Sequence, residues 1–123
     1  MPEKVQPRQT EISRTAMICV VLAMVTFVAF EGVRNNNFVF YDDNQYVTAN
    51  EHVKKGLNFE SVRWAFTTWY QGNWHPLTWM SHLTDSTIFG MKPAGHHWAS
   101  VGFHIANVIL LFLILKKMTG AVW

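Results

Sequence analysis

The hydrophobic positions of this chain fall into two uninterrupted blocks, one near each end. The first block runs from Thr15 to Phe30 and the second from Trp98 to Leu115, and neither contains a charged residue. As helices rising about 1.5 Å per residue, they would span roughly 24 and 27 Å, close to a hydrocarbon core of about 30 Å. The pattern therefore predicts two membrane-spanning helices, which we place at residues 15–33 and 98–115.

The first block could instead be the apolar core of a cleaved signal peptide, with Lys4, Arg8 and Arg14 as its basic region. A signal peptidase site requires small residues at the exit of the apolar block. The block runs instead into Phe30 and Glu31, without a small-x-small pair. We therefore expect an uncleaved helix.

Lysine and arginine residues flank the two blocks on their outer sides. The N-terminal tail holds Lys4, Arg8 and Arg14, and the second block ends on Lys116 and Lys117. The positive-inside rule then predicts that both ends of the chain are cytoplasmic and that the loop faces the periplasm or the lumen. The expected division is a tail at 1–14, a span at 15–33, an outer loop at 34–97, a span at 98–115 and a cytoplasmic end at 116–123.

Two short helices are predicted within the outer loop. Asn58 is a suitable cap for a helix that continues to Phe66. Pro76 suits the first turn of a second helix, which Gly90 ends after Phe89. We expect one face of this second helix to carry Leu77, Met80, Leu83 and Thr84. Because tryptophans favour the headgroup region, we expect both helices to lie at the membrane interface, together with Trp64, Trp69, Trp74 and Trp79.

The composition supports a membrane protein and argues against a nucleic-acid-binding one. Half of the residues are hydrophobic and only 15% are charged, whereas soluble domains carry about 25% charged residues. The net charge of +2 is small, and the basic residues form no stripe. The one cysteine, Cys19, lies inside the first block and has no partner for an intrachain disulfide. The expected fold is an all-α membrane protein with two spans and short interfacial helices between them.

An acidic pair, Asp42 and Asp43, follows the first span closely. Three interpretations remain open for it. One carboxylate could act as a general base, with its pKa raised by the other and by partial burial. Both could help to hold a divalent metal through their oxygens. Alternatively, the pair could form a turn or cap a helix beside Asn44.

The loop is also rich in histidine, at positions 52, 75, 82, 96 and 97. A zinc site requires three or four ligands in tetrahedral geometry, and the chain contains neither an HExxH motif nor a cysteine pair. His96 and His97 are adjacent and would point apart on a helix. We therefore do not favour a metal site at these histidines, which could instead donate hydrogen bonds to a phosphate. In the second span, His104 and Asn107 share a face, which indicates contact with a further helix.

Residues 38–120 resemble the start of the bacterial membrane proteins that carry C-terminal tetratricopeptide repeats. The resemblance is sharpest at YDD (residues 41–43), WHPL (74–77) and GHH (95–97), which follow one another in the same order. Those proteins are similar to the transmembrane and tetratricopeptide repeat O-mannosyltransferases of the GT-C fold. The resemblance implies a multi-pass protein of the bacterial inner membrane, of which this chain is a fragment of the helical bundle.

The resemblance also implies an activity. GT-C enzymes take a sugar from a polyprenyl phosphate carrier and use an acidic residue of the first outer loop. By resemblance, Asp43 or Asp42 would deprotonate the hydroxyl of a protein acceptor. Arg63, His75, His96 and His97 would be candidates for binding the phosphate of the lipid-linked donor. The implied partners are membrane lipids, the donor and the acceptor protein, with a divalent metal as an optional cofactor.

GT-C enzymes have many more membrane helices than the two expected here. We therefore expect the 123-residue chain to be a truncated product that is inactive by itself. The main alternative is a small non-enzymatic protein with two spans that binds a partner through its aromatic loop. A metal-dependent hydrolase that uses the loop histidines and Asp85 is the least favoured alternative.

Overall fold

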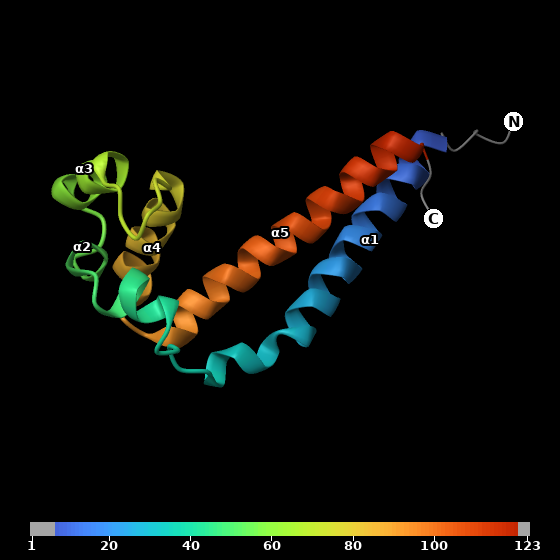
Figure 1. Ribbon diagram of the computed structural model, residues 1–123. Helices are drawn as coiled ribbons and strands as arrows, with labels where there is room; N and C mark the ends of the chain where they lie inside the picture. Colours follow the sequence, from blue (N-terminus) through green and yellow to red (C-terminus); the bar gives the residue numbers. More distant parts are fainter. Residues whose placement is uncertain (1–6, 121–123) are drawn as a thin grey trace, which may run out of the picture. The chain divides into compact units, whose positions relative to one another are not determined.

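A computed structural model describes residues 7–120, and all of its regular elements are helical (Figure 1). Strand pairing in the described part is limited to an isolated bridge between Tyr70 and Asn73. The predicted all-α class is therefore confirmed. The elements are α1 (Pro7–Ala29), the 3-10 helix η1 (Glu31–Asn35), the π-helix η2 (Asn44–Thr48), α2 (Glu51–Lys54), α3 (Phe59–Thr67), α4 (Pro76–Phe89) and α5 (Pro93–Thr119).

The chain divides into two compact units, and the boundary between them lies within α5. The helix-pair unit contains α1 and the two residues that follow it, up to Glu31, together with the part of α5 from Ser100 onward. The loop unit comprises Gly32–Ala99 and therefore includes the first turns of α5.

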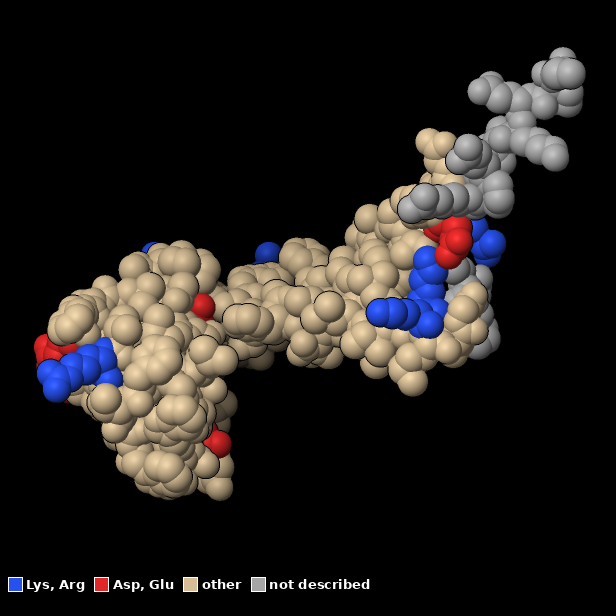
Figure 2. Space-filling view, turned by 90° about the horizontal axis from the view of Figure 1, so that it is seen from above, with Lys and Arg blue, Asp and Glu red and all other residues tan. Residues whose placement is uncertain are grey.

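In the helix-pair unit, two helices are long and apolar enough to cross a membrane. The candidate spans cover Gln9–Asn35 and Pro93–Thr119, with mean hydropathies of 2.3 and 2.1. Both helices begin before the apolar blocks do, because backbone hydrogen bonding continues into the polar flanks and proline fits the first helical turn. Figure 2 shows a surface with few charged residues along the paired helices.

Polar contacts join the two helices of this unit at the end that carries Lys116. The Lys116 ammonium lies 3.0 Å from Oε1 of Glu11 and donates a hydrogen bond of 2.7 Å to the Thr15 hydroxyl. Lys and Arg (blue) and acidic side chains (red) gather at this end in Figure 2. Farther along the pair, the rings of Phe30 and His104 meet edge to face at 5.1 Å. His104 of the polar face predicted for the second span thus contacts the residue that directly follows α1.

The loop unit is built around α4, which packs against α2 and α3. Trp79 of α4 is fully buried in its core, so this tryptophan does not belong to the predicted interfacial belt. Leu83 of the predicted apolar face is buried as expected, but Leu77 of that face is 77% exposed, because the buried side of α4 is centred on Trp79 and Leu83. The core consists of Val47, Val53, Ala65, Trp79 and Leu83.

The predicted cap of α3 and both predicted ends of α4 are confirmed, and α3 ends at Thr67, one residue beyond the prediction. The Asn58 side chain accepts a hydrogen bond of 2.9 Å from the N–H of Ser61, which caps the first turn of α3. Gly90 ends α4 with a φ of 62°, a left-handed conformation that suits glycine. The short helix α2 was not predicted from the sequence, and Asn50 caps it through its side-chain oxygen.

Candidate functional site

Three polar side chains converge where α4 meets the start of α5. His82 and Asp85 lie three residues apart on α4, so they share one face of that helix, and His96 lies on the first turns of α5. One potential ligand atom from each residue lies within 4.8 Å of the other two. Asp85 and His96 are both buried, with 9% and 6% of their surface exposed. We call these three residues the His-Asp-His cluster.

The short connection between α4 and α5 brings His96 to this position. Gly95 approaches Phe89 so closely that a Cβ atom there would lie 2.3 Å from the Phe89 ring. Nε2 of His96 donates a hydrogen bond of 2.9 Å to the carbonyl of Gly90. Since a carbonyl only accepts, this bond puts the proton on Nε2 and the imidazole lone pair on Nδ1.

Burial changes the proton affinity of two members of the cluster. It lowers the pKa of His82, and the neighbouring His96 and His75 lower this pKa further, while the charge of Asp43 raises it. Burial raises the pKa of Asp85, and His96 opposes that shift. Both shifts have the same cause, since each favours the uncharged form of a side chain that is withdrawn from water.

Asp43 precedes η2 and makes a local turn. Its Oδ2 accepts a hydrogen bond of 2.9 Å from the N–H of Val39, four residues earlier. The side chain makes no capping hydrogen bond to η2, so the structure favours the turn over the helix cap. Asp42 is exposed, whereas Asp43 is partly buried, which distinguishes the two members of the acidic pair.

The segment that leads to Asp43 contacts the start of α5. The ring of Phe38 lies 5.4 Å from the ring of His96 and 6.1 Å from that of His97. Together with the effect of Asp43 on His82, these contacts bring the acidic segment and the GHH motif to one region of the loop unit. Residues separated by more than fifty positions in the sequence thus meet there.

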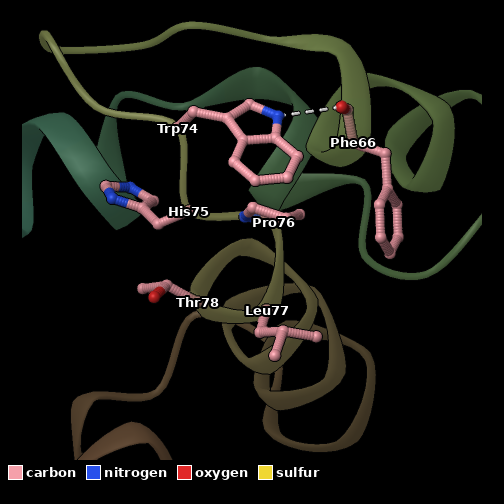
Figure 3. A pocket seen from close by; sticks show the side chains of 6 residues that line it. All are labelled: Phe66, Trp74, His75, Pro76, Leu77 and Thr78. Carbon is pink, nitrogen blue, oxygen red and sulfur yellow. Dashed lines mark hydrogen bonds between the residues drawn. The ribbon is translucent and has the colours of Figure 1, made fainter.

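His75 lies at the N-terminus of α4 and contacts two aromatic rings that stack on each other. Its ring centroid is 5.6 Å from that of Tyr46 and 5.0 Å from that of Trp79. A pocket of about 470 Å³ lies beside it (Figure 3). One edge of this pocket is fixed by the Trp74 indole N–H, which donates to the Phe66 carbonyl at 3.0 Å. The lining is largely apolar and consists of Phe66, Trp74, His75, Pro76, Leu77 and Thr78.

Of the His-Asp-His cluster, only His96 was predicted from the sequence as a residue of the favoured site, whereas Asp85 and the loop histidines were assigned only to the least favoured alternative, a metal-dependent hydrolase. The spacing of His82 and Asp85 on a predicted helix was the available signal, but a third ligand from another helix could not be assigned without the turn at Gly90. Arg63 lies exposed on α3, and none of its described contacts reaches this cluster.

Comparisons of the chain with protein-family models, with curated proteins and with solved structures find no match.

Proposed function

We propose that this chain is the N-terminal portion of a glycosyltransferase that uses a polyprenyl-phosphate sugar. The observation that carries the proposal is the position of Asp43. It is a partly buried carboxylate that shortly follows a helix able to span a membrane, and its charge acts on His82. Such a location suits chemistry on a lipid-linked donor, because its reacting sugar lies near the membrane surface.

The proposed reaction transfers the sugar to a hydroxyl of an acceptor protein. The hydroxyl oxygen forms a bond to the anomeric carbon while the bond from that carbon to the phosphate oxygen breaks. Asp43 accepts the hydroxyl proton, and the polyprenyl phosphate leaves with the electron pair of the broken bond. The Val39 N–H donates to one oxygen of Asp43, which leaves the other oxygen available to the acceptor hydroxyl.

The phosphate of the donor requires hydrogen-bond donors or positive charge. His97 is the best-placed candidate, since it contacts Phe38 in the segment that leads to Asp43. His96 also contacts Phe38, but its ring N–H already donates to the Gly90 carbonyl. The ring contacts of His75 are with Tyr46 and Trp79 rather than with Phe38, and His75 also lowers the pKa of His82. Arg63 contributes only if another part of the protein brings the donor to the exposed side of α3.

Substitution of Asp43 tests the proposal in the complete gene product that contains this chain. Asp43→Asn retains an oxygen that can accept from Val39 but removes the base. Transfer of sugar from a radiolabelled polyprenyl-phosphate donor to an acceptor peptide should fall at least about 100-fold. Glu60→Gln is a matched control, because Glu60 is an exposed carboxylate of the same unit.

Asp42→Asn resolves which member of the pair acts, and we expect it to reduce transfer less because Asp42 is exposed. Immunoblots of membrane fractions must show equal insertion of all variants. Full transfer by both the Asp42 and the Asp43 variant would overturn the proposal.

A second function is favoured by the exposed aromatic surface of the loop unit. Several large apolar side chains there are mostly exposed, which is typical of a surface that another protein covers. Under this alternative the chain is a non-enzymatic protein with two spans that binds a larger membrane protein. Crosslinking followed by affinity purification should recover one stoichiometric partner. Recovery of no partner would eliminate this alternative. The most exposed of these residues are Phe40, Tyr41, Phe59, Trp69 and Leu77.

A further inference from the structure

We propose that His82, Asp85 and His96 form a binding site for one divalent transition metal ion, with Zn²⁺ as the preferred ion. The proposal rests on the His-Asp-His cluster and is independent of the glycosyltransferase activity. It adds a metal site that the sequence analysis did not assign.

The spacing of the three residues suits zinc after a small adjustment. Their potential ligand atoms already lie within 4.8 Å of one another. In a tetrahedral site with bonds of about 2.0–2.1 Å, neighbouring ligand atoms lie about 3.4 Å apart. Side-chain rotations that shorten each separation by an ångström or so would therefore close the site. The backbone of α4 already holds His82 and Asp85 on one face.

The hydrogen bond of His96 matches the outer contacts of known metal-binding histidines. Such histidines usually donate their second ring N–H to a carbonyl or carboxylate, which fixes the tautomer and the direction of the ring. Nε2 of His96 donates in this way to the Gly90 carbonyl. Nδ1 is then the nitrogen that carries the lone pair and becomes the ligand.

The remaining ligands also suit a cation. Nδ1 of His82 is buried and has no hydrogen-bond partner among the described residues. Asp85 is a buried carboxylate, and a bound cation would compensate for the hydration that the charged carboxylate loses on burial. Asp43 adds a negative charge that acts on the same region.

The mixture of ligands identifies the class of metal. Two imidazole nitrogens disfavour Mg²⁺ and Ca²⁺, which prefer oxygen ligands throughout. Fe²⁺ also accepts two histidines and one carboxylate, but a site of nitrogen and oxygen ligands generally binds Zn²⁺ more tightly. Three protein ligands leave a fourth tetrahedral position for water or an external group. The ion would tie α4 to the start of α5 across the turn at Gly90.

Zinc binding by the purified full chain tests the proposal. The chain is prepared in detergent without a histidine tag, stripped with a chelator, and titrated with Zn²⁺ by equilibrium dialysis and elemental analysis. We expect one tightly bound zinc per chain. His82→Gln, Asp85→Asn and His96→Gln should each weaken binding at least about 100-fold, more than the loss of an outer contact does.

His97→Gln and His52→Gln are matched controls, because both residues are partly buried histidines of the same unit outside the cluster. Both should retain zinc. X-ray absorption of the zinc-loaded, unmodified chain needs no variant and should show two imidazoles and at least one additional oxygen. The proposal would be overturned if the unmodified chain bound no zinc or if the cluster variants bound it undiminished. It would also be overturned by tighter binding of Fe²⁺ than of Zn²⁺, or by a spectrum without two imidazoles.

Discussion

The hydroxyl of Thr87 accepts a hydrogen bond of 2.7 Å from the backbone N–H of Leu57, thirty residues earlier in the chain. The same hydroxyl donates to the Leu83 carbonyl at 2.8 Å, so it joins the end of α4 to the turn that precedes α3. Gly56 makes this approach possible, because its φ is +67° and a Cβ atom there would lie 2.6 Å from the Thr87 oxygen. A single side chain thereby fixes two helices of the loop unit relative to each other.

Thr87→Val should destabilise the loop unit by about 1 kcal/mol, because valine has nearly the same shape but cannot accept from Leu57. Thr87→Ser retains the hydroxyl and should lose less stability than the valine variant. Thermal unfolding of the full chain in detergent, followed by near-UV circular dichroism, compares the two variants. Equal melting temperatures for the valine and serine variants would show that the hydrogen bond contributes nothing measurable.

Trp79→Ala should destabilise the loop unit by about 3–5 kcal/mol, since it leaves a large cavity at a fully buried site. Trp79→Phe should reduce the stability of the loop unit much less. It keeps most of the ring stacking on Tyr46 at 5.1 Å and removes an indole N–H that lacks a partner among the described residues. Denaturant titration monitored by circular dichroism gives the ranking. Trp69→Ala is the control, because Trp69 is 74% exposed and should change stability little.

Asn58→Ala should destabilise α3 by about 1 kcal/mol through loss of its cap. The side chain accepts from the Ser61 N–H and also donates to the Gly56 carbonyl at 3.2 Å and to the Ser61 hydroxyl at 2.9 Å. Asn58→Asp keeps the cap but loses both donated bonds, so its stability should fall between those of the asparagine and alanine proteins. An aspartate variant no more stable than the alanine variant would contradict a role for the cap.

Local signals in the sequence located the helices well. Asn58, Pro76 and Gly90 act on their immediate neighbours, so their meaning can be inferred without the fold. The apolar blocks likewise predicted the two long helices, because length and hydropathy are properties of a segment alone. These features define the element order and the all-α class.

The candidate site was less accessible from the sequence, because it depends on contacts between distant segments. Trp79 was assigned to an interfacial belt, but only the packing of α3 and α2 against α4 reveals that it is buried. In the same way, His96 joins His82 and Asp85 only because Gly95 allows a close turn against Phe89. Periodicity along one helix cannot indicate which residue of another helix completes a cluster.

The orientation of the two candidate spans gives the last prediction. Lys116 lies beside Glu11 and Thr15, so the two helix ends meet, and the positive-inside rule assigns this end to the cytoplasm. In a Cys19→Ala background, a membrane-impermeant maleimide should label Glu60→Cys in intact spheroplasts, because the loop unit then faces outward. Gln9→Cys should react only after permeabilisation. The reverse pattern would invert the proposed topology and place Asp43 on the cytoplasmic side, away from an outward-facing donor sugar.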